Sequence, residues 1–374
     1  MNERLRSLSA EFGQSPWIDN LRRADLQSGA FGALVARGVR GVTSNPAIFE
    51  KAFANSTEYD TQFAQLFERG ESVEQTFWTV AYSDVAAACD LLREVYEQSN
   101  GMDGYVSLEV SPAVANDAPA TTAAARAIHE AVAKPNLMVK IPATAACLES
   151  IETMIGEGRN INITLIFGLE RYDQVIDAYL KGLETHADAG VRDLSSVASV
   201  ASFFVSRVDK EVDKRLETLG TPEALGLRGR AAVAQAILAY QLARERFSGP
   251  RWDKLVALGA RIQRPLWAST SVKNPAYPDT LYVDSLIGPD TINTMPEPTL
   301  EAFCAHGTLA RTIDQADAVA EARQVWTALA AVGIDMADVA RILEDEAIAS
   351  FSKSFEDLLS ALQARSAEFS DPER

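Results

Sequence analysis

Lys140 is the residue best suited to covalent chemistry. It lies in the segment NLMVKIPAT, where apolar residues flank it on both sides. Burial among such neighbours favours the neutral amine over the ammonium form, and a neutral amine can attack a ketone to form an imine. A structural role is the alternative, because a buried lysine is usually held by a carboxylate, here Glu109 or Asp19.

Two carboxylates, Asp19 and Glu109, could supply the proton transfers that imine chemistry requires. Water must leave the carbinolamine, and a hydroxyl beside the breaking C–C bond must lose its proton. Asp19 closes the run PWID, and Glu109 lies near the end of the run YVSLEV. Because the two belong to different runs, they can serve the two steps separately.

Neutral polar residues occupy similar places. Asn45 follows the run GVTS, and Asn162 and Thr164 lie within NINITLIF. The two asparagines could hydrogen-bond the hydroxyls of a polyol without adding charge. For each asparagine alone, a turn or a helix cap is the alternative, and Asn45 precedes Pro46, which is a common turn pair.

A phosphate site is indicated in the segment ASFFVSRVDKEVD, which leaves a strand and opens a helix. Ser202 and Arg207 there could hold a phosphate through the hydroxyl, the guanidinium and the amides of the helix start. Lys273, in STSVKNP, is a second candidate cation. For Arg207, a salt bridge to Asp209 or Glu211 is the alternative.

All of these residues lie in, or just after, short runs of apolar or small residues. Such runs are typical of strands that are buried on both faces of a parallel sheet. The eight predicted strands are Pro16–Asp19, Gly41–Ser44, Tyr105–Val110, Leu137–Ile141, Asn160–Phe167, Ser196–Ser202, Pro265–Ser269 and Asp290–Thr294.

The segments between these runs have helical periodicity. Ser72 and Gln75 predict a capping box at the start of one helix, and a second helix is expected from Leu169 to Gly190. Thr280–Ile287 is ambiguous by period, and only the alternation makes it a helix. Strands that alternate with helices, without a glycine-rich nucleotide-binding motif, favour an α/β fold of the (β/α)8 barrel type over an open sheet.

The chain is longer than a minimal barrel. We expect residues 1–374 to form one domain, with extra helices before the first strand, between the second and third strands (Pro46–Gly104), and after the last strand, from Met295 on. Because barrel chemistry is located at the carboxyl ends of the strands, the polar residues above are expected to meet at one site.

The charge balance restricts the ligands. The chain has 35 Lys and Arg against 52 Asp and Glu, a net charge of −17. This acidity argues against nucleic acid as a partner, because a phosphate backbone needs a basic face. A small phosphorylated ligand stays possible, provided that its cations are gathered locally in a cleft.

Composition also restricts the location and the metal chemistry. The N-terminus lacks the apolar core of a signal peptide, and no apolar stretch is long enough to span a bilayer, so a cytoplasmic location is expected. Cys89, Cys147 and Cys304 are far apart, which favours buried thiols in a reducing compartment. The three histidines are scattered, so no metal site is expected.

Several segments together resemble the transaldolase family. They occur in that family's order and run from about Asp19 to beyond Met295, and the long form is similar to transaldolases of actinobacterial and cyanobacterial type. The matching segments are GVTSNPAIFEKA, VSLEVSP, LMVKIPAT, INITLIF, SFFVSRVD and YPDTLYVDSLIGPDTINTMP.

The resemblance implies a TIM barrel and assigns catalytic roles. The imine-forming lysine on the fourth strand is Lys140, and the general acid/base for C–C cleavage is Asp19. Glu109 and Thr164 are implied to act through a water that serves the carbinolamine and imine steps.

The resemblance also implies substrate-binding roles. Asn45 and Asn162 hold the bound three-carbon unit, Ser202 and Arg207 bind the phosphate, and the aromatic ring of Phe204 lines the site.

One position departs from the family pattern. Lys273 stands where shorter members often have an arginine, and a lysine supplies charge without a bidentate fork.

The expected reaction transfers a dihydroxyacetone unit from sedoheptulose 7-phosphate to glyceraldehyde 3-phosphate, giving erythrose 4-phosphate and fructose 6-phosphate. No metal and no organic cofactor are expected, and the partners are phosphorylated ketoses and aldoses. Two alternatives stay open: an aldolase that releases dihydroxyacetone from fructose 6-phosphate, and a non-catalytic barrel that only binds sugar phosphate. The assembly is expected to be a monomer or a homodimer.

Overall fold

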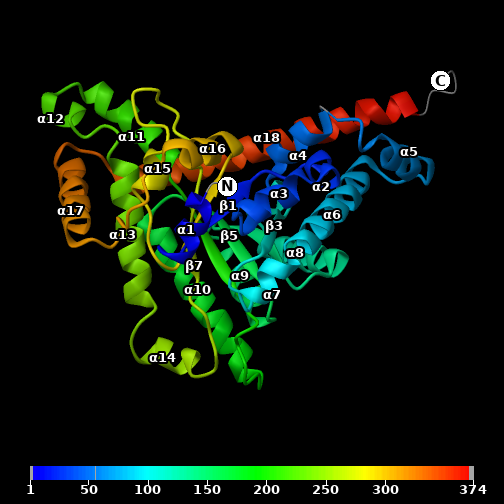
Figure 1. Ribbon diagram of the computed structural model, residues 1–374, viewed down its shortest axis with the longest axis horizontal. Coiled ribbons are helices and arrows are strands. Elements are labelled where there is room, and N and C mark those ends of the chain that lie inside the picture. The colour runs from blue at the N-terminus through cyan, green and yellow to red at the C-terminus, as the bar shows by residue number, and fades with distance from the viewer. Residues whose placement is uncertain (1–2, 55, 370–374) are drawn as a thin grey trace.

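The strands of the protein close into a parallel barrel in chain order, β1 to β8 (Figure 1). The computed structural model describes residues 3–54 and 56–369. The strands are β1 Gln14–Asp19, β2 Gly41–Thr43, β3 Tyr105–Glu109, β4 Leu137–Pro142, β5 Ile161–Ile166, β6 Ser199–Phe204, β7 Arg264–Ala268 and β8 Thr291–Met295. The predicted (β/α)8 barrel is therefore confirmed.

Seven of the eight predicted strands agree with the structure to within two residues at each end, and the sixth does not. It was expected at Ser196–Ser202, but β6 begins at Ser199 and continues to Phe204. The small residues of SVAS belong partly to the preceding loop, while the two phenylalanines that follow Ser202 are buried. Ser202 consequently lies inside the strand and not at its end.

Helices surround the barrel, and three groups of them lie where surplus chain was expected. These groups are α1 Arg4–Ala10 at the N-terminus; α4 Pro46–Ala54, α5 Asp60–Glu68, α6 Val73–Leu91 and α7 Arg93–Gln98 between β2 and β3; and α16 Glu297–His306, α17 Ala316–Ala331 and α18 Met336–Phe369 at the C-terminus. The predicted capping box between Ser72 and Gln75 is present at the start of α6.

The remaining helices connect consecutive strands. They are α2 Arg23–Ser28 and α3 Ala30–Arg37; the 3-10 helix η1 Pro112–Val114 and α8 Ala118–Val132; α9 Leu148–Gly156; α10 Leu169–Asp188; α11 Ser206–Leu219, α12 Pro222–Leu225, α13 Ala231–Arg246 and α14 Pro250–Val256; and α15 Leu281–Asp284. The ambiguous segment Thr280–Ile287 is helical only over the single turn of α15.

The long C-terminal helix α18 lies across the carboxyl ends of the strands. It packs against α4, η1 and α11, which follow β2, β3 and β6, and it also contacts β5. Figure 1 shows α18, in red, running beside α4 along the top of the view. The helix therefore covers the end of the barrel where the polar residues were expected to meet.

The opposite end of the barrel is closed by a buried ion-pair network. Arg264 of β7 donates through its two terminal nitrogens to Asp103, Ser15 and two backbone carbonyls, at 2.6–3.1 Å. The Asp103 carboxylate also accepts from the Ser15 hydroxyl at 2.8 Å and from Arg40 at 2.7 Å. Asp103 and Arg264 are both nearly inaccessible to solvent.

Candidate active site

Lys140 points into the barrel because side chains alternate along β4. Its neighbours Val139 and Ile141 are fully buried on the outer face, among apolar residues, while the Lys140 side chain faces the interior. Nζ donates to the carbonyl of Ser44 at 2.9 Å and lies 3.1 Å from Oε2 of Glu109. The apolar setting expected from the sequence thus holds for the outer face, whereas the amine itself has polar partners.

Glu109 is the direct neighbour of Lys140 across the sheet. The two residues are register partners on β3 and β4, so their side chains leave the same level of the barrel. Burial raises the pKa of Glu109, the charge of Lys140 opposes this rise, and the charge of Asp19 adds to it. A carboxyl whose pKa is raised, within 3.1 Å of an amine, is placed to exchange a proton with it.

Asp19 ends β1 on the same side of the barrel. Its Oδ1 accepts a hydrogen bond from the Thr43 hydroxyl at 2.8 Å. Burial raises the pKa of Asp19, and the charges of Lys140 and Lys273 oppose this rise. Asp19 also lines a cleft of about 390 Å³ between the β1–α2 connection and α4, which provides space beside its carboxylate.

Asn162 is held by hydrogen bonds to two neighbouring strands. Its amide donates to the Ser107 hydroxyl of β3 at 3.0 Å, and its Oδ1 accepts from the Ser202 hydroxyl of β6 at 2.7 Å. Asn162 is also the register partner of Lys140 on β5. The structure therefore brings Ser202 to Asn162, and no hydrogen bond within the described residues joins Ser202 to Arg207.

Thr164 lies two residues after Asn162 on β5, so its side chain faces the same interior of the barrel. Its hydroxyl is fully buried and has no hydrogen-bond partner among the described residues. The next residue, Leu165, has a φ of 62°, and the pairing of β5 with β6 shifts register there. The register shift marks a β-bulge, which interrupts the hydrogen-bond ladder beside Thr164. Such bulges are common next to functional sites.

Asn45 adopts the capping role that was the alternative for it. Its side-chain oxygen accepts from the amide of Ile48 at 3.2 Å in the first turn of α4. It nevertheless lines a narrow cleft together with Glu109 and Phe355, a residue of α18. Asn45 is therefore beside the lysine–glutamate pair while it also caps the helix.

Arg207 lies in the first turn of α11, half-buried, with its guanidinium carbon 5.8 Å from the centroid of the Phe204 ring. The alternative salt bridges are not formed within the described residues. Asp209 instead accepts from Tyr282 and from a backbone amide, each at 2.7 Å, and Glu211 pairs with Arg215. Burial lowers the pKa of Arg207.

Lys273 is close to other cations. Its ammonium donates to the hydroxyl of Ser271. Burial lowers the pKa of Lys273, and the charges of Arg207, Lys210 and Lys51 lower it further. This side of the barrel end therefore gathers positive charge locally, as a phosphate site in so acidic a chain requires.

Sequence reasoning missed several residues that support the site. Thr43 holds Asp19, the Ser44 carbonyl accepts from Lys140, and Ser107 holds Asn162. Ser107 could have been found by alternation, since it lies two residues before Glu109 on the same face. Phe355 gave no such signal, because it comes from a helix more than 200 residues away in sequence.

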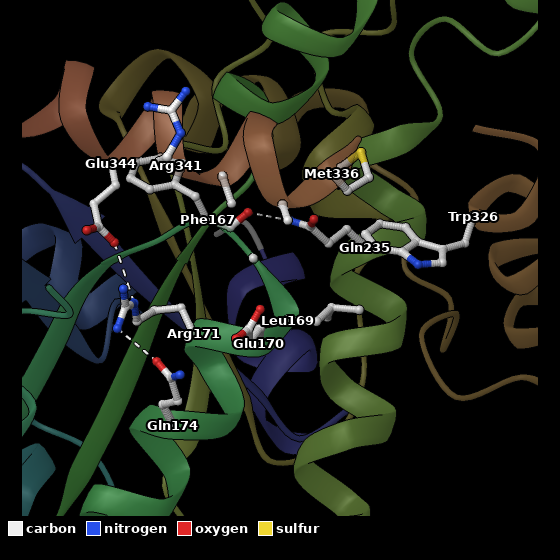
Figure 2. Close-up of a pocket in the computed structure, with 13 residues that line it drawn as sticks. Phe167, Leu169, Glu170, Arg171, Gln174, Gln235, Trp326, Met336, Arg341 and Glu344 are labelled. Atoms are coloured by element: carbon white, nitrogen blue, oxygen red, sulfur yellow. Dashed lines mark hydrogen bonds and ion pairs between the residues drawn. The ribbon is translucent and has the colours of Figure 1, made fainter. Parts of the chain in front are cut away.

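A second cavity, of about 310 Å³, lies outside the barrel at the start of α10, and none of the predicted site residues lines it (Figure 2). No helix of the described residues is long and apolar enough to cross a membrane. Within the same residues, no group of three or more His, Cys, Asp or Glu side chains could hold a metal ion. Cys89, Cys147 and Cys304 are buried, and they form no disulfide within the described residues.

The fold and the site together define a class: a (β/α)8-barrel enzyme with a buried lysine paired to a carboxylate at the carboxyl ends of the strands. Comparison with known proteins then gives the family. The family described as Transaldolase/Fructose-6-phosphate aldolase matches residues 16–362, and the chain belongs to it.

Relatives with high identity agree with this assignment. Proteins named transaldolase from Mycolicibacterium smegmatis and Frankia alni are 51% and 50% identical, covering 97% of this chain and 98% and 97% of their own lengths. One from Thermobifida fusca is 51% identical over 96% of this chain and 97% of its own. The chain is accordingly a transferase enzyme with transaldolase function.

Proposed function

We propose that the chain transfers a dihydroxyacetone unit from sedoheptulose 7-phosphate to glyceraldehyde 3-phosphate through a Schiff base on Lys140. The observation that carries the proposal is the position of Lys140, a nearly inaccessible amine 3.1 Å from Glu109 and within the electrostatic field of Asp19. The transaldolase name of the relatives supports the same reaction.

Imine formation requires the neutral amine of Lys140. Glu109 is its nearest base and accepts the ammonium proton, after which the amine attacks C2 of the ketose phosphate. Water then leaves the carbinolamine as the imine forms, and Glu109 returns a proton to the departing oxygen. We assign to the Thr164 hydroxyl the positioning of the water in this step, because this hydroxyl is buried and has no hydrogen-bond partner among residues 3–54 and 56–369.

C–C cleavage requires a second base. Asp19 takes the proton of the C4 hydroxyl, the C3–C4 bond breaks, and its electrons move into the iminium to leave an enamine on Lys140. The raised pKa of Asp19 suits it to both directions of this transfer, because it then returns the proton to the acceptor's new alkoxide. Asn45 and Asn162 are proposed to hydrogen-bond the three-carbon unit meanwhile.

The phosphate is proposed to bind where the cations gather. Arg207 is the principal anchor, because a guanidinium can grip two oxygens, and Lys273 adds a point charge. The Phe204 ring lines the site beside Arg207, and the Ser202 hydroxyl, within β6, is proposed to contribute to phosphate binding. Arg207→Ala should raise KM for phosphorylated aldehydes much more than for free glyceraldehyde, and Lys273→Ala should do so more weakly. An equal effect on both substrates would mean that Arg207 is structural.

The reaction itself is tested with the purified chain. Given sedoheptulose 7-phosphate and glyceraldehyde 3-phosphate, it should form fructose 6-phosphate, Lys140→Met should abolish this, and EDTA should leave the rate unchanged. Free dihydroxyacetone in the products would favour the aldolase alternative, and binding without turnover would favour the non-catalytic barrel. Loss of activity in EDTA that a divalent ion restores would indicate a metal-dependent aldolase.

The broader setting is also proposed. Buried cysteines that form no disulfide within the described residues suit a reducing, cytoplasmic location. We further propose that residues 1–374 form a single domain, that the protein is a monomer or a homodimer, and that it requires no organic cofactor.

A further inference from the structure

The first part of α18 lies alongside α11, the helix that carries Arg207. Asp338, in the first turn of α18, forms an ion pair with Arg215 of α11 at 2.9 Å. Counting eight residues back along α11 from Arg215 leads to Arg207, and counting eight forward along α18 from Asp338 leads to Glu346. Each step covers about 12 Å of helix. Because α11 packs against α18 and Glu346 interacts electrostatically with Arg207, the two helices run in opposite directions and Glu346 lies level with Arg207.

Contacts with α10 fix α18 in this register. Arg171 of α10 pairs with Glu344 at 3.5 Å, and Figure 2 shows the two side chains reaching toward each other beside the outer cavity. The backbones approach closely at Gly168, where an added Cβ would lie 2.9 Å from the Cβ of Ala340. The part of α18 just before Glu346 is thus fixed against both α10 and α11.

Glu346 places a negative charge near the proposed phosphate anchor without neutralising it. The charge of Glu346 raises the pKa of Arg207 against the effect of burial. The two side chains form no ion pair within the described residues, and the Glu346 side chain is exposed. The guanidinium consequently keeps its donors available to a phosphate, while the carboxylate acts on the same phosphate by repulsion.

We infer that Glu346 is a specificity-determining residue that weakens the binding of phosphate at Arg207 and so speeds the release of phosphorylated products. Arg207, Lys273, Lys210 and Lys51 attract a dianion together, and each turnover must release two phosphorylated sugars. A fixed carboxylate near the anchor offsets part of that attraction. The inference rests on the proposed function, because it takes Arg207 as the phosphate anchor.

The test compares Glu346→Gln with Asp345→Asn. Asp345 is the adjacent residue, is also exposed and pairs with Arg341, so its variant loses the same charge away from Arg207. Glu346→Gln should lower KM for glyceraldehyde 3-phosphate by roughly two- to fivefold, because partly screened charges have small effects. KM for free glyceraldehyde should not change, and Asp345→Asn should alter neither value.

Inorganic phosphate gives an independent readout. As a competitive inhibitor it should bind Glu346→Gln more tightly by the same factor, and the difference from the unmodified protein should shrink as salt is raised. Equal changes for both aldehydes, or an unchanged phosphate affinity, would overturn the inference. Arg207→Ala separates the two failures: if it weakens phosphate while Glu346→Gln does nothing, only the role of Glu346 is wrong. If it leaves phosphate affinity intact, the proposed anchor is wrong.

Discussion

Each end of the barrel buries a cation beside a carboxylate, but the two ion pairs differ in the number of hydrogen bonds that hold the cation. At the amino-terminal end, Asp103 accepts from Ser15, Arg40 and Arg264, and Arg264 makes four hydrogen bonds through its terminal nitrogens. At the carboxyl end, the partners of Lys140 within the described residues are one carbonyl and one carboxylate.

The difference separates a structural pair from a reactive one. Arg264 cannot lose its proton in a protein, and its network holds β1, β7 and β8 together. Lysine can lose its proton, and the carboxyls near Lys140 have pKa values raised by burial. The end with fewer hydrogen bonds to its cation and with carboxyl pKa values raised by burial is therefore the one suited to chemistry.

The largest expected effect is on turnover at the carboxyl end. Asp19→Ala should still form the Lys140 adduct but lose roughly 10²–10⁴-fold in kcat, because Asp19 is assigned to C–C cleavage and not to imine formation. Steady-state kinetics and adduct trapping on the same preparation measure both effects. Near-normal turnover would remove Asp19 from the mechanism.

At the amino-terminal end the expected effect is on stability. Asp103→Ala leaves Arg264 buried without its carboxylate, and breaking such a pair typically costs about 3–5 kcal/mol of unfolding free energy. Urea unfolding measures the loss, and kcat per folded molecule should be unchanged. If the variant kept its stability but lost activity, the assignment of a purely structural role to the Asp103–Arg264 pair would be wrong.

Asp209, a buried residue two positions after Arg207 on α11, should make stability depend on pH. Burial raises its pKa from 3.8 to about 6, so the folded state favours the protonated form. This contribution is fully present below pH 3.8 and is lost as pH rises through 6, a change of roughly 3 kcal/mol. The unfolding free energy of Asp209→Asn, relative to the unmodified protein, should therefore rise between pH 4 and 7. A constant difference across this range would contradict the prediction.

The smallest expected effect concerns Thr164. Its buried hydroxyl has no hydrogen-bond partner in the described part of the chain, so Thr164→Val should leave the unfolding free energy unchanged or raise it by about 1 kcal/mol. Turnover should fall about tenfold, the equivalent of one lost hydrogen bond. Thermal unfolding and kinetics of the same variant decide the point, and a destabilised variant with full activity would make Thr164 a structural residue.

The sequence predicted the barrel well because its strands are buried on both faces and appear as apolar runs. The sixth strand was misplaced because small residues precede it, and small residues fit a loop or a strand equally well. Polar residues within apolar runs led to the prediction of Asp19, Glu109 and Lys140 as site residues.

What the sequence left open depends on register and long-range packing. Either carboxylate could have paired with Lys140, and the structure selects Glu109 because β3 and β4 are adjacent, whereas β1 is not beside β4. The sequence predicts extra helices from Met295 on, but not that one of them, α18, crosses the barrel end and brings Phe355 to the site.

The central claim is that Lys140 carries the substrate as an imine. Incubation with fructose 6-phosphate, reduction with borohydride and mass spectrometry of the peptides test it most directly. The predicted result is a reduced three-carbon adduct on the peptide that contains Lys140. No adduct, or an adduct on another lysine, would contradict the mechanism.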